Sequence, residues 1–321
     1  MGDPVRILVA MAAAALIAAA ALLLCAWPWR SPRPARAQVG SVLGVGLGFV
    51  AGCWWLGWRP HWPPGEDQDR LLLVLLPALV LVELVGAARG GLRRLAWPLR
   101  LVVAAGAARV LLHDSIYLTD LPGPVAREWT PEQTWLILGG LGAALAVVWT
   151  ALALLVRRAP GRSVPLAVAL SCAGAAVTIM LSGSASGGQL GLPLAAAVAG
   201  GVVASLVLGK PPDLNGVLGL SVVGLFALLV AGHFFGSLSA GHAVVLFFGP
   251  LLCWLPELPA RFRGLARLAW AVVPVAVVLA LARLKFVESS TQTSPASKPS
   301  AAQKAPDPNE PTLQDILDFR K

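Results

Sequence analysis

Charged residues are scarce in this sequence. Asp, Glu, Lys and Arg make up 13% of its 321 residues, whereas a soluble globular protein carries about 25%. Hydrophobic residues reach 57%, and the mean hydropathy is +0.75. This composition excludes a sizeable soluble domain and indicates an integral protein of the lipid bilayer.

Cysteines and catalytic signatures are also few. The four cysteines all lie inside apolar runs without metal-type spacing, so they are interpreted as small core residues and neither a disulfide framework nor a zinc site is indicated: Cys25, Cys53, Cys172 and Cys253. The sequence has no nucleophile elbow, His-Glu-x-x-His or dinucleotide fingerprint. We therefore expect no metal, no cofactor and no identified catalytic residue, and an enzyme is less favoured than a non-enzyme.

Long apolar runs fill most of the chain. Because a helix alone satisfies its own backbone hydrogen bonds in lipid, each run of about 20 residues predicts a transmembrane helix. Residues 1–287 are thus predicted to form an all-α, polytopic transmembrane helix bundle. One start is well marked, because Thr130 to Gln133 has a capping-box pattern. The ten predicted spans are 7–27, 39–58, 71–88, 95–113, 134–156, 164–182, 190–208, 214–235, 240–257 and 266–287.

Basic residues alternate between the connecting loops. Thirteen Arg and Lys residues follow the odd-numbered spans, and four lie on the opposite side before the tail. By the positive-inside rule the first set is cytoplasmic, which places both termini outside the cytoplasm. The expected location is a bacterial-type inner or plasma membrane. The net charge of +9 therefore marks topology, and no nucleic-acid partner is expected.

Two distant segments resemble each other. Shifting the chain by 173 positions aligns Pro77–Val102 with Pro250–Val275 at ten identical positions, including Trp97 on Trp270. This predicts a possible parallel internal repeat of spans 1–4 and 7–10, an arrangement found in transporters. Convergence within a low-complexity sequence is the alternative.

Charges at membrane depth are the sharpest functional signal, because each costs at least ~2.5 kcal/mol unless it is paired. Glu83 and Arg100 lie about one turn from the cytoplasmic ends of neighbouring spans, at matching depth. We expect a structural ion pair. Extension of Arg100 to the interface, or a substrate-binding role for both residues, remains open.

A second polar cluster lies near the outer face. Arg109 is about half a turn out of phase with Arg100, and His113, Asp114 and Tyr117 follow it. Such a cluster could bind an anionic group or move a proton, so all four are candidate substrate-binding residues. Capping of the span and contact with lipid headgroups is the alternative.

The C-terminal tail has a different composition. Residues 288–311 are rich in Ser, Pro and Ala and predict a disordered linker. Residues 312–321 predict a short amphipathic helix that could dock on a protein partner, or simply fray. The docking residues would be Leu313, Ile316, Leu317 and Phe319.

Three functions fit these features. A transporter of a small solute or lipid precursor is favoured by the possible repeat and the membrane-depth charges. A membrane scaffold that recruits a partner through its tail is the first alternative. A membrane-embedded enzyme acting on a lipid-linked substrate is the second.

Overall fold

The computed structural model describes residues 3–26, 34–88, 91–118, 128–158, 161–208, 215–254 and 263–292. The chain divides into two compact units, Met1–Arg283 and Leu284–Lys321, and the first contains every site described below. All regular structure in the described ranges is helical. The elements are α1 (Pro4–Ala26), α2 (Pro34–Trp55), α3 (Asp67–Arg70), the π-helical turn η1 (Leu71–Leu75), α4 (Leu76–Ala87), α5 (Leu92–Leu111), α6 (Pro131–Arg158), α7 (Ser163–Leu181), α8 (Ala185–Gln189), α9 (Gly191–Val207), α10 (Asn215–Phe234), α11 (Ala240–Phe248), the 3-10 turn η2 (Gly249–Trp254) and α12 (Arg263–Gln292).

Seven of the described helical segments are long and apolar enough to cross a bilayer, so the chain is an integral, multi-pass membrane protein. They are Pro4–Ala26, Ala35–Trp55, Asp67–Ala87, Pro131–Arg158, Ser163–Leu181, Gly187–Val207 and Gly216–Phe234. Two further apolar helices, Ala240–Trp254 and Ala269–Leu284, are shorter. α5 coincides with a predicted span but contains four arginines, which removes it from the apolar set. The all-α prediction is confirmed, and each of the ten predicted runs coincides with a helix.

The last described helix is longer than predicted. α12 continues to Gln292, past the expected end of the bundle at residue 287, and the chain has no proline between residue 287 and Pro295. The rest of the predicted linker and the docking residues Leu313, Ile316, Leu317 and Phe319 lie outside the described residues.

Small residues bring the N-terminal helix into backbone contact with its neighbours. A Cβ atom at Gly48 of α2 would lie 2.5 Å from the carbonyl oxygen of Ala14, and one at Gly200 of α9 would lie 2.3 Å from that of Ala15. α1 therefore packs against both α2 and α9 through close approach, as helices in lipid commonly do.

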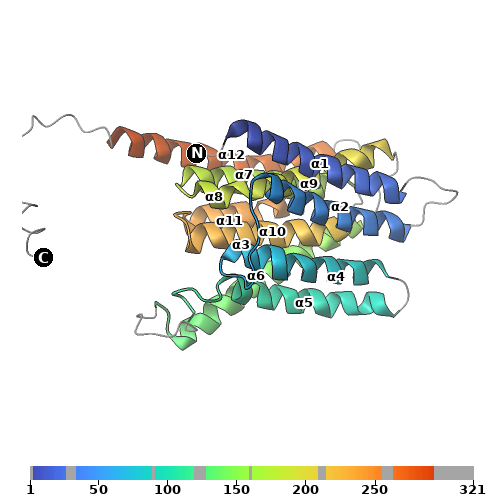
Figure 1. Ribbon diagram of the computed structural model, residues 1–321, viewed down its shortest axis with the longest axis horizontal. Helices are drawn as coiled ribbons and strands as arrows, with labels where there is room; N and C mark the ends of the chain where they lie inside the picture. The colour runs from blue at the N-terminus through green and yellow to red at the C-terminus, as the bar shows by residue number, and fades with distance from the viewer. Residues whose placement is uncertain are drawn as a thin grey trace, which may run out of the picture. The chain divides into compact units, whose positions relative to one another are not determined.

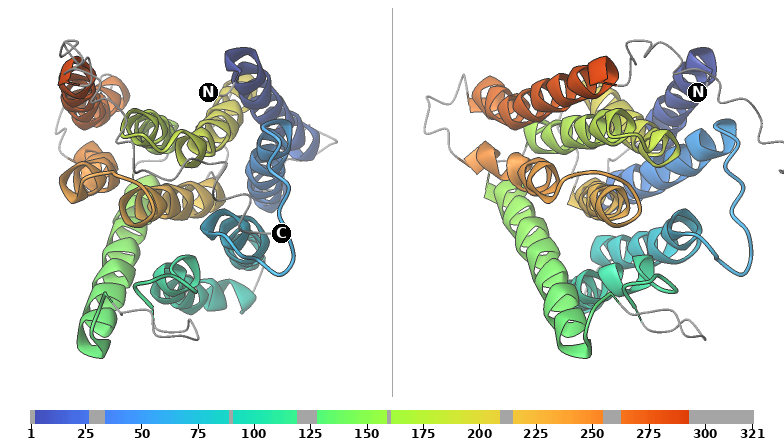
Figure 2. Two further views of the ribbon diagram at one scale, coloured as in Figure 1. Left: turned by 60° about the vertical axis from the view of Figure 1, so that its left-hand side comes forward. Right: turned by 90° about the vertical axis from the view of Figure 1, so that its left-hand side faces the viewer.

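α10 is the interior helix of the first unit. In its apolar stretch 83% of the residues are buried, against 22% for α1. It contacts α2, α4, α6 and α7, and Figure 2 shows these helices around it. α10 contains no Asp, Glu, Lys or Arg, so a carboxylate packed against it, such as that of Glu83, must be neutralised from another helix.

α4, α5 and α6 pack in sequence along one side of α10 (Figure 1). α4 and α5 form a hairpin, and α6 packs along α5. The predicted capping box is confirmed at the start of α6: the Thr130 N–H donates to Oε1 of Gln133 at 3.0 Å, and the Gln133 N–H donates to Oγ1 of Thr130 at 3.3 Å. These helices position the charged residues of the candidate site.

Candidate functional site

Glu83 of α4 and Arg100 of α5 form a buried two-pronged ion pair. Arg100 donates from Nε to Oε1 at 3.0 Å and from Nη2 to Oε2 at 2.5 Å. Glu83 is 0% exposed and Arg100 is 7% exposed. Two parallel bonds fix the orientation of both groups as well as their charge. The pairing predicted from matching depth is confirmed.

Two further helices enclose the pair. Trp149 of α6 lies under the guanidinium, with Cζ of Arg100 5.6 Å from the ring centre, so the cation also contacts the indole face. From α10, a Cβ atom at Gly219 would lie 2.2 Å from Oε1 of Glu83. Four helices therefore meet at one ion pair, and each supplies a different part of its surroundings.

A cavity of about 410 Å³ reaches Arg100 from the end of the bundle where α5 begins and α6 ends. Arg93 and Arg157 also line it, together with the polar residues Gln38 and Thr150. Its remaining walls are small or apolar: Gly86, Ala96, Trp97, Ala153 and Leu154. None of these lining residues is acidic. The cavity is therefore a basic chamber with the ion pair at its boundary, suited to binding anions.

Arg109 belongs to a separate groove of about 610 Å³ between α5 and α6. Thr134, Trp135 and Gly142 share that groove. Arg100 and Arg109 thus line different cavities, in agreement with their predicted half-turn offset. The groove is mostly apolar around its one arginine, an arrangement that suits an amphipathic ligand.

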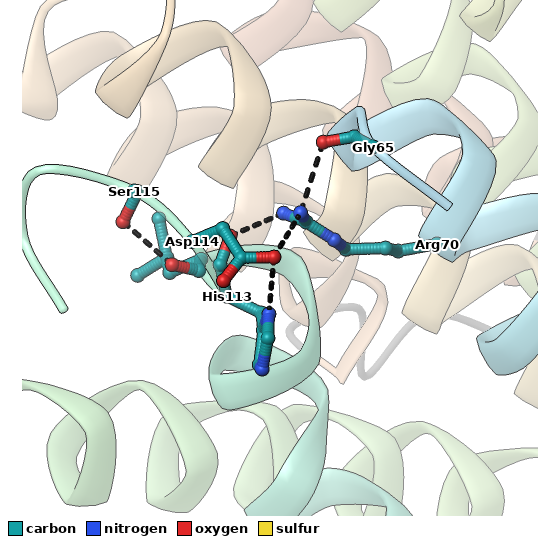
Figure 3. A network of polar contacts seen from close by, with 6 residues as sticks. Gly65, Arg70, His113, Asp114 and Ser115 are labelled. Atoms are coloured by element: carbon teal, nitrogen blue, oxygen red, sulfur yellow. Dashed lines mark hydrogen bonds and ion pairs between the residues drawn. The ribbon is translucent and has the colours of Figure 1, made fainter. Parts of the chain in front are cut away.

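His113 and Asp114 take part in a network centred on Arg70 (Figure 3). Arg70 is 5% exposed and donates to the Gly65 carbonyl at 2.9 Å, to Oδ2 of Asp114 at 3.2 Å and to the His113 carbonyl. Nδ1 of His113 lies 2.7 Å from Oδ2 of Asp114. Arg70 therefore ties the start of the α3–η1–α4 segment to the residues that follow α5.

Tyr117 lies in an aromatic cluster away from that network. Its hydroxyl donates to the Phe234 carbonyl at 3.1 Å, and its ring centre is 4.9 Å from Trp129 and 5.2 Å from Phe234. Burial, and then the negative charge of Glu128, raise the pKa of the Tyr117 phenol. The four residues predicted as an outer cluster are thus divided among a groove, a network and an aromatic contact.

Sequence reasoning missed several participants. Arg93 and Arg157 are two of the thirteen basic residues that the charge pattern assigns to cytoplasmic loops, and the sequence does not predict that they share a cavity with Arg100. Arg93 lies in the first turn of the same helix as Arg100, and Arg157 lies in the last turn of α6. Arg70 is one of the four basic residues that the charge pattern places on the opposite side. It directly precedes an apolar run, and that position could have indicated its burial. Nothing in the sequence pairs Trp149 with Arg100, because aromatic residues inside apolar runs are common.

Metal and family information add nothing to these sites. Among the residues that the structure describes, no three His, Cys, Asp or Glu side chains lie close enough to hold a metal ion. Comparisons with protein-family models, with curated proteins and with solved structures find no match to this chain.

Proposed function

We propose that this protein is a membrane transporter of a small polar solute or lipid precursor, and that its substrate occupies the basic chamber at Arg100. The observation behind this proposal is a chamber of about 410 Å³ whose wall includes a buried, paired arginine. Small-molecule sites in proteins have volumes of about 300–1,000 Å³. Ionisable groups inside a membrane bundle commonly mark solute pathways.

In this proposal ten helices cross the membrane, including α5 and the shorter apolar helices. α5 can cross despite its arginines because Arg100 is buried against protein, while Arg93 and Arg94 lie in its first turn. The basic end of the bundle is then cytoplasmic and the chamber opens there. The parallel repeat stays a prediction; if it is real, the chamber lies beside one of its two copies.

Transport is favoured over catalysis because the polar residues near the outer face make separate contacts. Tyr117 donates to a backbone carbonyl, His113 and Asp114 contact each other beside Arg70, and Arg109 lines another groove. These contacts give the described residues no common reaction centre. The scaffold alternative depends on the tail, which lies outside the described residues.

Uptake into proteoliposomes tests the proposal. Purified protein would be assayed with radiolabelled inorganic phosphate, succinate, phenyl phosphate and glucose. We expect at least one solute to enter faster than into empty liposomes, and Thr150→Trp to stop that uptake because the indole fills the chamber. Val147→Trp is the matched control, since Val147 lies on the same helix and is 58% exposed. Uptake equal to empty liposomes for all four solutes, or full activity of Thr150→Trp, would contradict the proposal.

A further inference from the structure

We propose that the chamber lined by Arg93, Arg100 and Arg157 binds a phosphate-bearing anion. As a statement about the transported substrate this inference rests on the proposed function, but as a statement about binding it stands by itself. The shared chemistry is a phosphate monoester, which could come from a soluble organic phosphate or from a lipid headgroup.

The charge balance of the chamber calls for an anion. Among the described residues that line it, three are arginines and none is acidic. Glu83 lies behind Arg100 and neutralises one of the three charges. Among the described residues, two positive charges in one chamber are therefore left to a ligand, which matches the charge of a phosphate monoester near neutral pH.

The donors suit phosphate better than a carboxylate. Guanidinium groups present planar forks that match phosphate oxygens, and three of them can serve the three terminal oxygens of a monoester. Glu83 accepts one N–H from Nε and one from Nη2 of Arg100, so both N–H groups of Nη1 and the second of Nη2 are not used by this carboxylate. Gln38 and Thr150 add neutral polar groups to the same wall. A carboxylate, with a single charge and two oxygens, would leave one positive charge unmatched.

The ligand has an organic part as well as a phosphate. A chamber of about 410 Å³ is far larger than one phosphate group needs. Trp97 and Leu154 supply apolar walls on the helices that also hold Arg93 and Arg157. An aromatic or aliphatic group attached to the phosphate would contact these walls and gain from burial there.

Adjacent arginines provide matched controls. Arg157 lines the chamber, whereas its neighbour Arg158 does not and lies 5.4 Å from the ring of Trp254. Arg93 lines it, whereas Arg94 does not. All four side chains are exposed, so replacing any of them by glutamine leaves the core intact. The two glutamine variants of each pair remove the same charge at nearly the same depth. A difference between their binding affinities is therefore due to the position of the side chain in the chamber.

The experiment is calorimetric titration of the full chain in phosphatidylcholine nanodiscs with phenyl phosphate, inorganic phosphate and benzoate. We expect saturable binding, with an affinity that decreases from phenyl phosphate to inorganic phosphate to benzoate. Arg157→Gln and Arg93→Gln should weaken phenyl phosphate binding about tenfold or more, as expected for loss of a hydrogen bond to a charged group. Arg158→Gln and Arg94→Gln should stay within about twofold of the wild type.

Nanodiscs that also contain phosphatidic acid distinguish the two sources. A lipid source predicts that phosphatidic acid blocks phenyl phosphate, and a soluble source predicts equal binding in both discs. Absence of saturable phenyl phosphate binding in phosphatidylcholine discs, or equal losses within each arginine pair, would overturn the inference. Binding without uptake would reject only transport, and uptake of another solute without phosphate binding would reject only this inference.

Discussion

The carboxylate of Glu83 lies directly against the backbone of Gly219. A Cβ atom at position 219 would be 2.2 Å from Oε1 of Glu83 and 2.8 Å from Cζ2 of Trp149. Glycine at this point of α10 therefore makes room for a charge in the interior of the bundle. The ion pair and α10 are closely packed, so a substitution in one of them displaces the other.

Gly219→Ala should destabilise the protein by about 1–3 kcal/mol, because the added methyl group displaces a buried carboxylate or indole. The measurement is the thermal unfolding midpoint in detergent. Gly140→Ala on α6 is the control, since a Cβ there meets nothing within 4 Å, and it should be neutral or slightly stabilising. Equal unfolding midpoints for the two variants would show that α10 and its neighbours shift to accommodate the methyl group without loss of stability.

The ion pair should behave as one structural unit. Glu83→Gln or Arg100→Gln alone leaves an uncompensated buried charge, with an expected cost of about 3–5 kcal/mol, whereas the double variant removes both charges and should cost much less. Thermal stability in detergent of the three variants forms the cycle. Strictly additive losses would reject the structural pair.

The same cycle also probes function. If the double variant regains stability but no longer takes up any solute, the pair belongs to the transport site as well as to the fold. If it regains both, the role of the pair is confined to holding α4 and α5 together. Wild-type uptake in proteoliposomes is the reference for both outcomes.

Helices and the ion pair could be predicted from the sequence because both follow from one-dimensional rules. Apolar run length predicts a helix in lipid, and counting residues from the charged loops placed Glu83 and Arg100 at one depth. α5 shows the limit of the first rule. Its arginines make it less apolar than the other helices, and only the fold shows that Arg100 is covered by protein.

The chamber and the Arg70 network could not be predicted, because both join segments that the sequence separates. Arg93 and Arg157 are 64 positions apart and meet only when α6 packs along α5. Likewise, Arg70 reaches residues after α5, although depth alone places it in an exposed loop. The sequence predicts how deep a residue lies in the membrane. The direction in which its side chain points around the helix depends on the neighbouring helices, which the sequence does not identify.

Arg70 should be sensitive to a conservative change. Arg70→Lys keeps the charge but cannot serve the Gly65 carbonyl, the His113 carbonyl and Asp114 together, so part of this part-buried hydrogen bonding is lost, at about 0.5–1.5 kcal/mol for each bond. Arg59→Lys is the control, because Arg59 is exposed and lies 5.6 Å from the ring of Trp54. Thermal unfolding in detergent should show a clear loss for the first and almost none for the second. A lysine variant as stable as wild type would mean that charge alone suffices.

The proposed topology gives a direct localisation test. Fusions of a cytoplasm-active reporter and a periplasm-active reporter at Pro34, Arg158 and the C-terminus should place the first two sites in the cytoplasm and the last outside. The reason is the thirteen-to-four asymmetry of basic residues. A cytoplasmic C-terminus together with a cytoplasmic Arg158 would mean that one of α7 to α12 does not cross the membrane.

Tyr117 permits a pH measurement without interference, because it is the only tyrosine in the chain. Burial, and then the Glu128 carboxylate, raise its pKa. Since the folded pKa lies above the unfolded value of about 10, this residue's contribution to stability is complete below pH 10 and is lost as the pH rises through the folded pKa.

The ultraviolet phenolate signal should therefore rise with a midpoint above 10 in the folded protein and near 10 after denaturation. Glu128→Gln should move the folded midpoint part of the way down, because it removes the negative charge but leaves the burial that is the larger cause. Glu132→Gln is the charge-matched control, since Glu132 does not contribute to the Tyr117 pKa, and it should leave the midpoint in place. A folded midpoint at the unfolded value, with the native state still intact, would mean that water reaches the Tyr117 hydroxyl and screens it from the Glu128 carboxylate.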